Sequence, residues 1–259
     1  MKILKRALEY VHQREHEGGG FTLYEGIPDG KNTYYGLLIM KMFNETPYNI
    51  DKTIKWVEDI QKGYIFGVYG KFNLVNILNL LGKKPEIADK YIHRLSNQKE
   101  FPNLETAYLS TVILHLTGHK KLNNIAEWIL SHQNEDGGFG KKNSNITLTQ
   151  YALESLNIIN RSLIRNERDI INFTNNCRTD EGIFAYTPNS YPPYIEAIYS
   201  GIRIHEILDV EPEYPDKIIN HVVKLQNNNG GFRRSIFLGI SELEYTFKAL
   251  YILKSLSYL

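Results

Sequence analysis

The sequence predicts an all-α protein, an α6/α6 toroid built from about six helix-hairpin repeats with GGF turns. Six times along the chain an apolar helical segment runs into a polar turn and then into a second apolar segment. Three of the turns are nearly the same: EHEGGGF, QNEDGGF and QNNNGGF, which end at Phe21, Phe139 and Phe232. A unit that recurs every roughly 35 to 50 residues cannot close a core alone and must stack on its neighbours.

The other turns are degenerate forms of the same pattern. They are found in the second, third and fifth repeats at residues 61–64 (QKGY), 98–101 (QKEF) and 179–184 (TDEGIF). Paired glycines allow positive φ at a helix end, and we expect the aromatic that follows to tuck between adjacent helix pairs. The Gln side chain is expected to bond backbone groups at a helix terminus.

The segments after the turns share one register, in which an aromatic is followed two residues later by a small residue. The pairs are Tyr34 with Gly36, Tyr108 with Ser110, Tyr199 with Gly201, and Phe247 with Ala249. These segments are apolar nearly all round, which predicts inner helices, and the small residues would let neighbouring helices approach closely. Segments before the turns, such as 53–60 and 127–130, alternate apolar and charged residues and are expected to form the outer layer.

Size and charge favour one compact domain over residues 1–259. The chain has 30 Lys and Arg against 29 Asp and Glu, so its net charge predicts neither nucleic acid nor an anionic membrane as partner. No stretch approaches the roughly 18 apolar residues of a spanning helix. The first 17 residues are charged and amphipathic rather than signal-like, which predicts a cytoplasmic protein.

Three glutamates stand three residues before the aromatic of the shared register: Glu105, Glu196 and Glu244. A carboxylate in the first turn of a helix is favoured by the helix dipole alone, and this explains each Glu singly. If the inner helices run parallel, however, the equivalent positions form a ring round one mouth of the cavity. We expect such a ring of acids to bind a cation, with the help of the neighbouring Tyr108, Tyr199 and Tyr245. In a reaction, the glutamates would act as an acid or would stabilise a developing carbocation by their charge.

Basic residues follow two of the GGF turns directly. Lys141 and Lys142 come after one turn, and Arg233 and Arg234 come after another. Of these, Lys142, Arg233 and Arg234 are candidates to hold a diphosphate, since Arg forks and Lys point charges both suit phosphate oxygens. A diphosphate would bring Mg²⁺ as its counter-ion. The alternative is solubilising charge on exposed turns.

Cysteine and histidine offer no metal or nucleophile pattern. Cys177 is the only cysteine, which excludes an intrachain disulfide, and we expect a partly buried or surface thiol there. His12 and His16 are four apart on the first helical segment, but no third zinc ligand is evident. The proline-containing segment 186–194 is a longer loop that either covers the cavity mouth or simply connects two helices.

The Q-x-x-x-G-G-F turns, followed by helices of the type E-x-T-aromatic-x-A-L, resemble the repeats of the prenyltransferase and squalene cyclase superfamily. The likeness covers essentially the whole chain and is strongest in the first, fourth and sixth repeats. The resemblance implies an α6/α6 toroid whose apolar central cavity accommodates an isoprenoid chain. It also implies a helical protein partner, since protein prenyltransferases work with a helical second subunit.

The chain departs from the functional motifs of that superfamily. Zinc-dependent members look like D-x-C-aromatic and D-x-x-H, where this chain has 147–150 (TLTQ), 196–199 (EAIY) and 244–247 (EYTF). The thiolate and the imidazole are missing, so zinc is not expected. The D-x-D-D acid of class II cyclases does not occur. Lys142 stands roughly where prenyltransferases place a phosphate-binding Arg.

Three functions remain open. The first is a prenyltransferase- or terpene-cyclase-like protein that binds a prenyl diphosphate in its central cavity. The second is a non-catalytic toroidal binding or scaffold protein. The third is a carbohydrate-active α/α toroid, which would need paired carboxylates in a groove lined by exposed aromatics. Only Trp56 and Trp128 are available as tryptophans, and both lie in expected outer helices.

Overall fold

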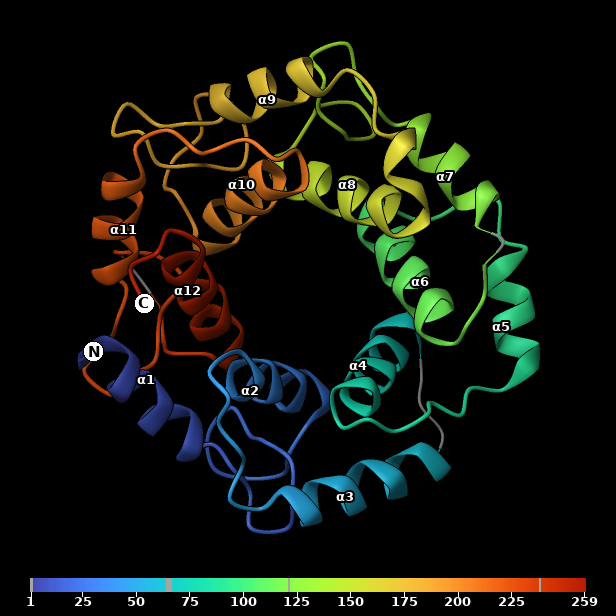
Figure 1. Cartoon of the computed structure of the whole chain (residues 1–259), viewed down its shortest axis with the longest axis vertical. Coiled ribbons are helices and arrows are strands. Elements are labelled where there is room, and N and C mark those ends of the chain that lie inside the picture. Colours follow the sequence, from blue (N-terminus) through green and yellow to red (C-terminus); the bar gives the residue numbers. More distant parts are fainter. Residues whose placement is uncertain (1, 64–66, 121, 238) are drawn as a thin grey trace. The chain divides into compact units, whose positions relative to one another are not determined.

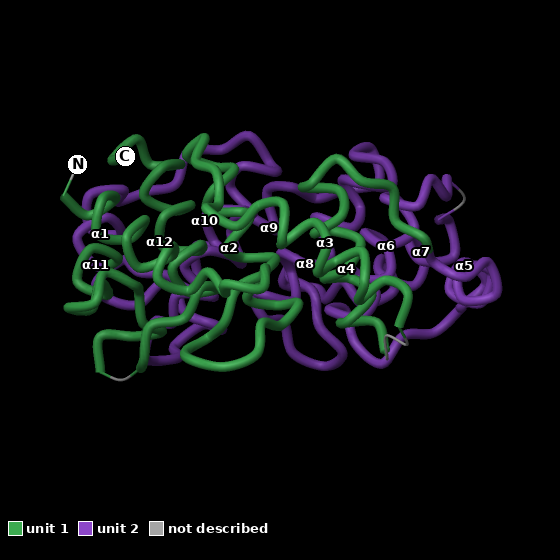
Figure 2. The backbone as a smooth tube through the Cα atoms, turned by 90° about the horizontal axis from the view of Figure 1, so that it is seen from below, with its two compact units in different colours: residues 1–86, 222–259 green, residues 87–221 purple. Residues whose placement is uncertain are grey.

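A computed structural model describes residues 2–63, 67–120, 122–237 and 239–259. The described residues form twelve α-helices, one short 3-10 helix and no strand, so the all-α class is confirmed. Tyr64 of the expected second turn lies outside the described residues. The contacts divide the chain into two compact units, residues 1–86 with 222–259, and residues 87–221 (Figure 2). The expectation of one domain over the whole chain stays a prediction.

The first unit has two layers of helices. Its helices are α1 (Lys2–His12), α2 (Gly30–Met42), α3 (Ile50–Lys62), α4 (Gly67–Leu80) and α12 (Leu243–Ser255). One layer consists of α12, α2 and α4, with α2 in contact with both others (Figure 1). In the other layer α1 packs on α2 and α12, and α3 packs on α4. Helix α11 (Pro215–Val223) crosses the boundary between the units.

The second unit repeats this arrangement. Its helices are α5 (Asp89–Ser96), α6 (Leu104–Leu116), α7 (Asn123–Leu130), α8 (Ile146–Asn160), α9 (Glu167–Asn176) and α10 (Ile195–Ile207), with a 3-10 helix η1 (Arg161–Leu163) after α8. Helix α8 lies between α6 and α10, while α5, α7 and α9 pack on this layer from one side (Figure 1). Helices that follow a turn and helices that precede one therefore form separate layers, as the sequence predicts.

Four of the turns are closed by a single antiparallel bridge. The bridges join Glu15 to Phe21, Gln133 to Phe139, Arg178 to Phe184, and Gln226 to Phe232, and all four phenylalanines are buried. The first glycine of the fourth turn, Gly137, has φ +89°, and a Cβ there would lie 2.4 Å from the Asp169 carbonyl carbon. Glycine is therefore required both by conformation and by space.

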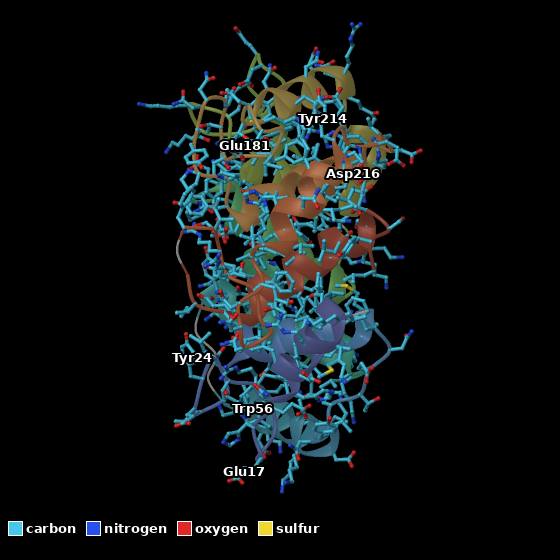
Figure 3. The ribbon with its side chains drawn as sticks, turned by 90° about the vertical axis from the view of Figure 1, so that its left-hand side faces the viewer. Glu17, Tyr24, Trp56, Glu181, Tyr214 and Asp216 are labelled. Carbon is cyan, nitrogen blue, oxygen red and sulfur yellow. The ribbon has the colours of Figure 1, made fainter. Side chains whose placement is uncertain are left out.

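The side chain at the glutamine position mainly closes its own turn. Gln133 and Gln226 donate to the carbonyl oxygens of Gly137 and Gly230, at 3.2 and 2.9 Å. Gln226 also donates to the Ile3 carbonyl oxygen at 2.9 Å, which is the helix-terminus bond that the sequence predicts. In the fifth turn, where Tyr214 lies near Glu181 (Figure 3), a Cβ at Gly182 would be 3.2 Å from the Tyr214 ring.

A buried hydrogen bond ties three of these turns to the helix that follows. The N–H groups of the turn phenylalanines donate to threonine hydroxyls: Phe21 to Thr33 at 2.9 Å, Phe139 to Thr149 at 2.9 Å, and Phe232 to Thr246 at 3.0 Å. In the fifth repeat the equivalent position is Ile198. The threonines therefore satisfy a buried donor that would otherwise remain unpaired.

Two small residues of the shared register make room for a turn phenylalanine. A Cβ at Gly36 would lie 2.7 Å from the ring of Phe21, and one at Gly201 would lie 2.4 Å from the ring of Phe184. The space that they leave is filled by the turn phenylalanine of the same repeat. The expectation that the small residues let neighbouring helices approach closely stays a prediction.

Helix α1 ends at His12, so His16 lies beyond it and the two histidines do not share a helical face. The loop 186–194 is tied to the start of α8, because the N–H of Ile146 donates to the carbonyl oxygen of Tyr186 at 2.9 Å. In the described part of the chain, none of the helices combines the length and the apolar character needed to cross a membrane.

We predict that Thr246→Val lowers the free energy of unfolding by about 1–3 kcal/mol, because the buried N–H of Phe232 loses its acceptor while the shape of the side chain is kept. Thr246→Ser keeps the hydroxyl and serves as the matched control. Urea unfolding followed by circular dichroism measures the difference. Equal losses in the two variants would show that the hydrogen bond is not what stabilises this turn.

Candidate ligand-binding face of α2 and α12

Neighbouring helices α2 and α12 present matched faces in the first unit. On α2, Lys31, Tyr35, Leu38 and Met42 recur at spacings of four, three and four residues, so they share one face. On α12 the corresponding face begins with Glu244. Asp29 caps α2 by accepting a hydrogen bond from the N–H of Asn32 at 2.9 Å. The Asp29 cap fixes the first residue of α2, and the turns before α2 and α12 hold the start of each helix, so the two faces begin at defined residues.

A network of four charged side chains occupies the N-terminal end of this face. Glu244 accepts from Lys31 and from Lys248, each at 2.6 Å, and Lys31 also lies 3.7 Å from Glu242. The side chains of Glu244 and Lys248 are 17% and 10% exposed. Two lysines and two glutamates give a locally neutral cluster, as a largely buried charge requires.

The network decides the protonation state of Glu244. Burial alone would raise the pKa of this carboxyl, but the charges and hydrogen bonds of Lys248 and Lys31 outweigh burial and lower the pKa to about 2. The same contact with Glu244 raises the pKa of Lys31 in spite of its desolvation. Glu244 is therefore a permanent carboxylate near neutral pH, which suits electrostatic stabilisation and does not suit proton donation.

Five aromatic rings form a continuous row across the layer of α4, α2 and α12. Phe72 of α4 meets Tyr34 of α2 with ring centroids 5.6 Å apart, and Tyr34 is followed by Tyr35 at 5.2 Å. Tyr35 meets Phe247 of α12 at 5.6 Å, and Phe247 meets Tyr251 at 5.9 Å. These separations are those of favourable tilted and edge-to-face pairs. We call these five residues the aromatic wall.

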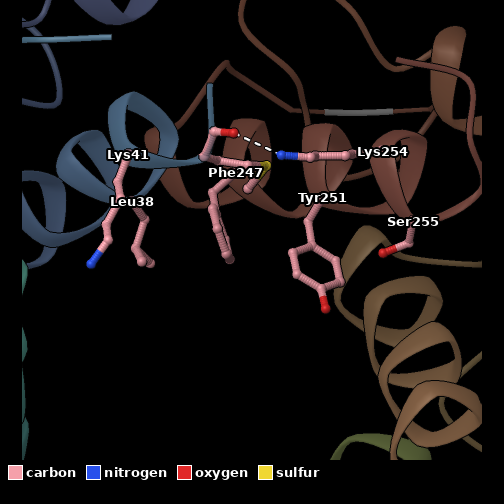
Figure 4. A pocket seen from close by; sticks show the side chains of 7 residues that line it. Leu38, Lys41, Phe247, Tyr251, Lys254 and Ser255 are labelled. Atoms are coloured by element: carbon pink, nitrogen blue, oxygen red, sulfur yellow. Dashed lines mark hydrogen bonds between the residues drawn. The ribbon is translucent and has the colours of Figure 1, made fainter. Parts of the chain in front are cut away.

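An open groove of about 540 Å³ lies at the C-terminal ends of the two helices (Figure 4). It is lined by Leu38, Lys41, Met42, Phe247, Tyr251, Lys254 and Ser255. Helices α2 and α12 thus carry charges at one end, aromatic rings along the middle and an apolar groove at the other end.

The structure places the sequence-predicted acids and tyrosines in both units. Glu105 and Glu196 lie in the first turns of α6 and α10 in the second unit and are half-buried, whereas Glu244 belongs to the first unit. Tyr108 stacks on Tyr151 of α8, with centroids 5.1 Å apart. Tyr199 and Tyr245 are half-buried on α10 and α12. The ring of acids round one mouth stays a prediction.

The predicted basic residues differ in their surroundings. Lys142 is exposed in the loop before α8 in the second unit. Arg233 is half-buried in the first unit, where its Nη2 donates to the Lys224 carbonyl oxygen at 3.4 Å, and its buried Nε has no hydrogen-bond partner among the described residues. Arg234 is half-buried beside it. Arg233 therefore retains a donor for a further acceptor.

The residues present do not fit a zinc ion. Among the described residues, no group of three His, Cys, Asp or Glu side chains is placed to hold a metal. Glu244, the acid at the position that resembles a zinc ligand, is already held by two lysines. His12 stacks on Tyr48 with centroids 4.0 Å apart and contacts Glu15 at 2.6 Å, so it is engaged in packing.

Cys177 and the two tryptophans belong to helices other than α2 and α12, or to the ends of such helices. The Cys177 side chain is fully buried at the end of α9, deeper than the sequence suggests, and burial, with a smaller contribution from Asp136, raises its pKa to about 12. Trp56 of α3 lies beside the first turn, near the labelled Glu17 (Figure 3). Trp128 of α7 packs on His132 and Phe101, at 4.0 and 5.3 Å.

Sequence reasoning missed the lysines of the site. Lys31 occupies the position in the first repeat that Glu244 occupies in the sixth, so aligning the repeats already pairs an acid with a base. Lys248 follows Glu244 by four residues, which is the spacing of a helical ion pair. Both signals are present in the sequence. Lys41 and Lys254 carry no such signal, because their groove arises only when α2 and α12 pack together.

The class defined by these layers and turns is an α-α toroid, and comparison with known families agrees. The profile of the prenyltransferase alpha-alpha toroid domain family matches residues 2–71 and 103–257. The chain belongs to this family, which confirms the predicted fold class and resemblance. A search of curated protein sequences gave no significant match.

Two solved structures are similar in fold. Candida albicans protein geranylgeranyltransferase-I complexed with GGPP matches with a TM-score of 0.68 and 16% identity, over 87% of this chain and 83% of that chain. A protein from Actinoplanes matches with a TM-score of 0.62 and 14% identity, over 99% of both chains. At these identities the likeness concerns the fold alone.

We predict that the Lys31–Glu244–Lys248 network makes stability depend on pH in the acid range. A pKa lowered from 4.5 to about 2 contributes roughly 3 kcal/mol above pH 4.5, and this contribution is lost as the pH falls towards 2. The difference in unfolding free energy between the wild-type protein and Glu244→Gln should therefore be largest near neutral pH and shrink towards pH 2. A difference that does not change with pH would contradict the ion-pair account.

We predict that the Cys177 thiol is inert in the folded protein. With its pKa raised from 9.0 to about 12, its thiolate fraction at pH 8 is about a thousandfold below that of an unfolded chain, and the side chain is also inaccessible. Reaction with a disulfide reagent should therefore be at least about a thousandfold slower than in denaturant. Fast labelling under native conditions would contradict this burial, with Cys177→Ser as the blank.

Proposed function

We propose that this chain binds an isoprenoid, in the form of a prenyl diphosphate, with its apolar chain laid along the aromatic wall. The single observation that carries the proposal is the continuous row of five rings, Phe72, Tyr34, Tyr35, Phe247 and Tyr251. Ring faces suit an unsaturated hydrocarbon, because they offer large apolar contact area and a negative quadrupole. The family, and the GGPP named with the Candida albicans structure, support the same ligand class.

The diphosphate is assigned to basic residues that follow the GGF turns. In the first unit Arg233 and Arg234 precede α12, and the buried Nε of Arg233 is left with a donor to satisfy. In the second unit Lys142 takes the corresponding place before α8. Charge-assisted bonds of this kind contribute about 1.5–3 kcal/mol each. Mg²⁺ would enter with the diphosphate oxygens as its main ligands.

The three glutamates are proposed as stabilisers of positive charge. Glu244 supports this role best, because its pKa of about 2 keeps it ionised. Glu105 and Glu196 hold the equivalent first-turn positions in α6 and α10. Tyr108, Tyr199 and Tyr245 lie within the next turn of the respective helix, and each would offer a ring face to a cation held by the glutamate of its own helix.

A non-catalytic binding protein is the second candidate. It is favoured by the same network, since a carboxylate closed in by Lys31 and Lys248 is not an available acid. A carbohydrate-active toroid ranks third, because Trp56 and Trp128 lie on α3 and α7, each of which precedes a turn in its own unit. Cytoplasmic location and a helical protein partner stay predictions. Product analysis with prenyl diphosphates separates an enzyme from a binder.

We predict that Tyr34→Leu and Tyr35→Leu each weaken binding of C10 to C20 prenyl diphosphates by about three- to tenfold, because they remove a ring but keep apolar volume. Tyr69→Leu is the matched control, since Tyr69 is an exposed tyrosine of α4 outside the wall. Native mass spectrometry of the purified chain measures the bound fraction. Equal effects of all three variants would overturn the role of the wall.

We predict that Arg233→Ala and Arg234→Ala each weaken binding of the same ligands by about tenfold or more, through loss of a charge-assisted hydrogen bond. Binding of the corresponding prenyl alcohols should not change. If the two variants weakened alcohol and diphosphate equally, the diphosphate would be bound elsewhere. Absence of binding by the wild-type protein would overturn the isoprenoid proposal as a whole.

A further inference from the structure

The groove at the C-terminal ends of α2 and α12 has the composition of a site for an amphiphile. Its floor and walls are apolar, made by Leu38, Met42, Phe247 and Tyr251. Its volume of about 540 Å³ lies within the range of about 300–1,000 Å³ that is usual for small-molecule sites. In Figure 4, Leu38, Phe247 and Tyr251 point to the same open side.

Two ammonium groups flank this apolar surface. Lys254 is held in place, since its Nζ donates to the carbonyl oxygen of Met42 at 2.7 Å and lies 5.3 Å from the centre of the Phe43 ring. Lys41 lies on the groove side of α2 beside Leu38 (Figure 4). Within the described part of the chain, no carboxylate pairs with either lysine, and the lining contains no acid. Charge complementarity therefore calls for an anion.

The groove is distinct from the basic loop that holds Arg233 and Arg234. That loop leads into the N-terminus of α12, whereas the groove is formed by Tyr251, Lys254 and Ser255 at its end. From Glu244 to Ser255 the helix rises by about 16 Å at 1.5 Å per residue. A head group bound at one end therefore does not contact the lysines at the other.

We propose that this groove binds a single-chain amphiphile with an anionic head, a phosphate monoester or a carboxylate. The tail packs on Phe247, Tyr251 and Leu38. The head accepts a hydrogen bond from Lys41, which points to the same side in Figure 4, and from Lys254 when its ammonium turns away from the Met42 carbonyl. Ser255 adds a hydroxyl at the rim. An anionic amphiphile would bind here whether or not the chain binds a prenyl diphosphate, but Phe247 and Tyr251 belong both to this groove and to the aromatic wall, so the two ligands would share those rings.

Isothermal titration of the full chain with four twelve-carbon probes tests the head group. Dodecyl phosphate and dodecanoate carry the two anionic heads, while dodecanol and dodecyltrimethylammonium, all below their micelle concentrations, are neutral and cationic. We expect binding of at least one anionic probe that is about tenfold or more tighter than that of the other two. The preference between the anionic probes identifies the head. Equal binding of all four, or none, overturns the proposal.

Paired variants locate the site. The double variant Lys41→Gln with Lys254→Gln removes both charges but keeps an amide donor for the Met42 carbonyl. It should weaken binding of the anionic probes about tenfold or more. Lys52→Gln with Lys55→Gln makes the same charge change at the hollow beside Trp56 and should leave binding unchanged. Equal effects of the two pairs would show binding through net charge alone and overturn the groove.

Two further variants test the tail and separate this site from the isoprenoid proposal. Ser255→Trp fills the groove without changing charge and should abolish binding of dodecyl phosphate, with thermal unfolding as the check on folding. Arg233→Ala with Arg234→Ala should leave dodecyl phosphate binding intact even if it removes prenyl diphosphate binding. Loss of both ligands in the arginine variant would overturn the assignment of the anionic head to Lys41 and Lys254.

Discussion

In the first, fourth and sixth repeats, the hydrogen bond from a buried phenylalanine N–H to a threonine hydroxyl sets the geometry on which the rest of the repeat depends. It fixes the turn before α2 to Thr33 and the turn before α12 to Thr246, so the N-termini of both helices are held against their own turns. The phenylalanine ring then fills the space left by a small residue such as Gly36. The loop carrying Arg233 and the first turn carrying Glu244 are positioned as a result.

The charged network on α2 and α12 follows from that positioning. Burying Glu244 and Lys248 is costly, and the cost is offset only because Lys31 completes a neutral set with Glu242. The network also keeps one carboxylate ionised at the end of an aromatic surface, where a cationic intermediate or a bound ligand would experience it.

Much of the fold could be predicted from the sequence, because its determinants are local and repeated. The closed turn with its buried phenylalanine recurs in four repeats of the described chain, and the two kinds of helix alternate along it. The three candidate glutamates could also be identified from the sequence, because they occupy the same position in three repeats. Of the two lysines that bind Glu244, Lys31 was harder to find, since it lies more than two hundred residues away in sequence. The groove at Lys41 and Lys254 has no local signature and arises only from packing.

Hydrogen–deuterium exchange of the whole chain, with and without geranylgeranyl diphosphate, tests the central claim that the face of α2 and α12 binds ligand. The account predicts slower exchange in peptides covering Gly30–Met42 and Leu243–Ser255, with little change in α3 and α5 of the other layers. Protection confined to those other helices, or no protection at saturating ligand, would contradict it.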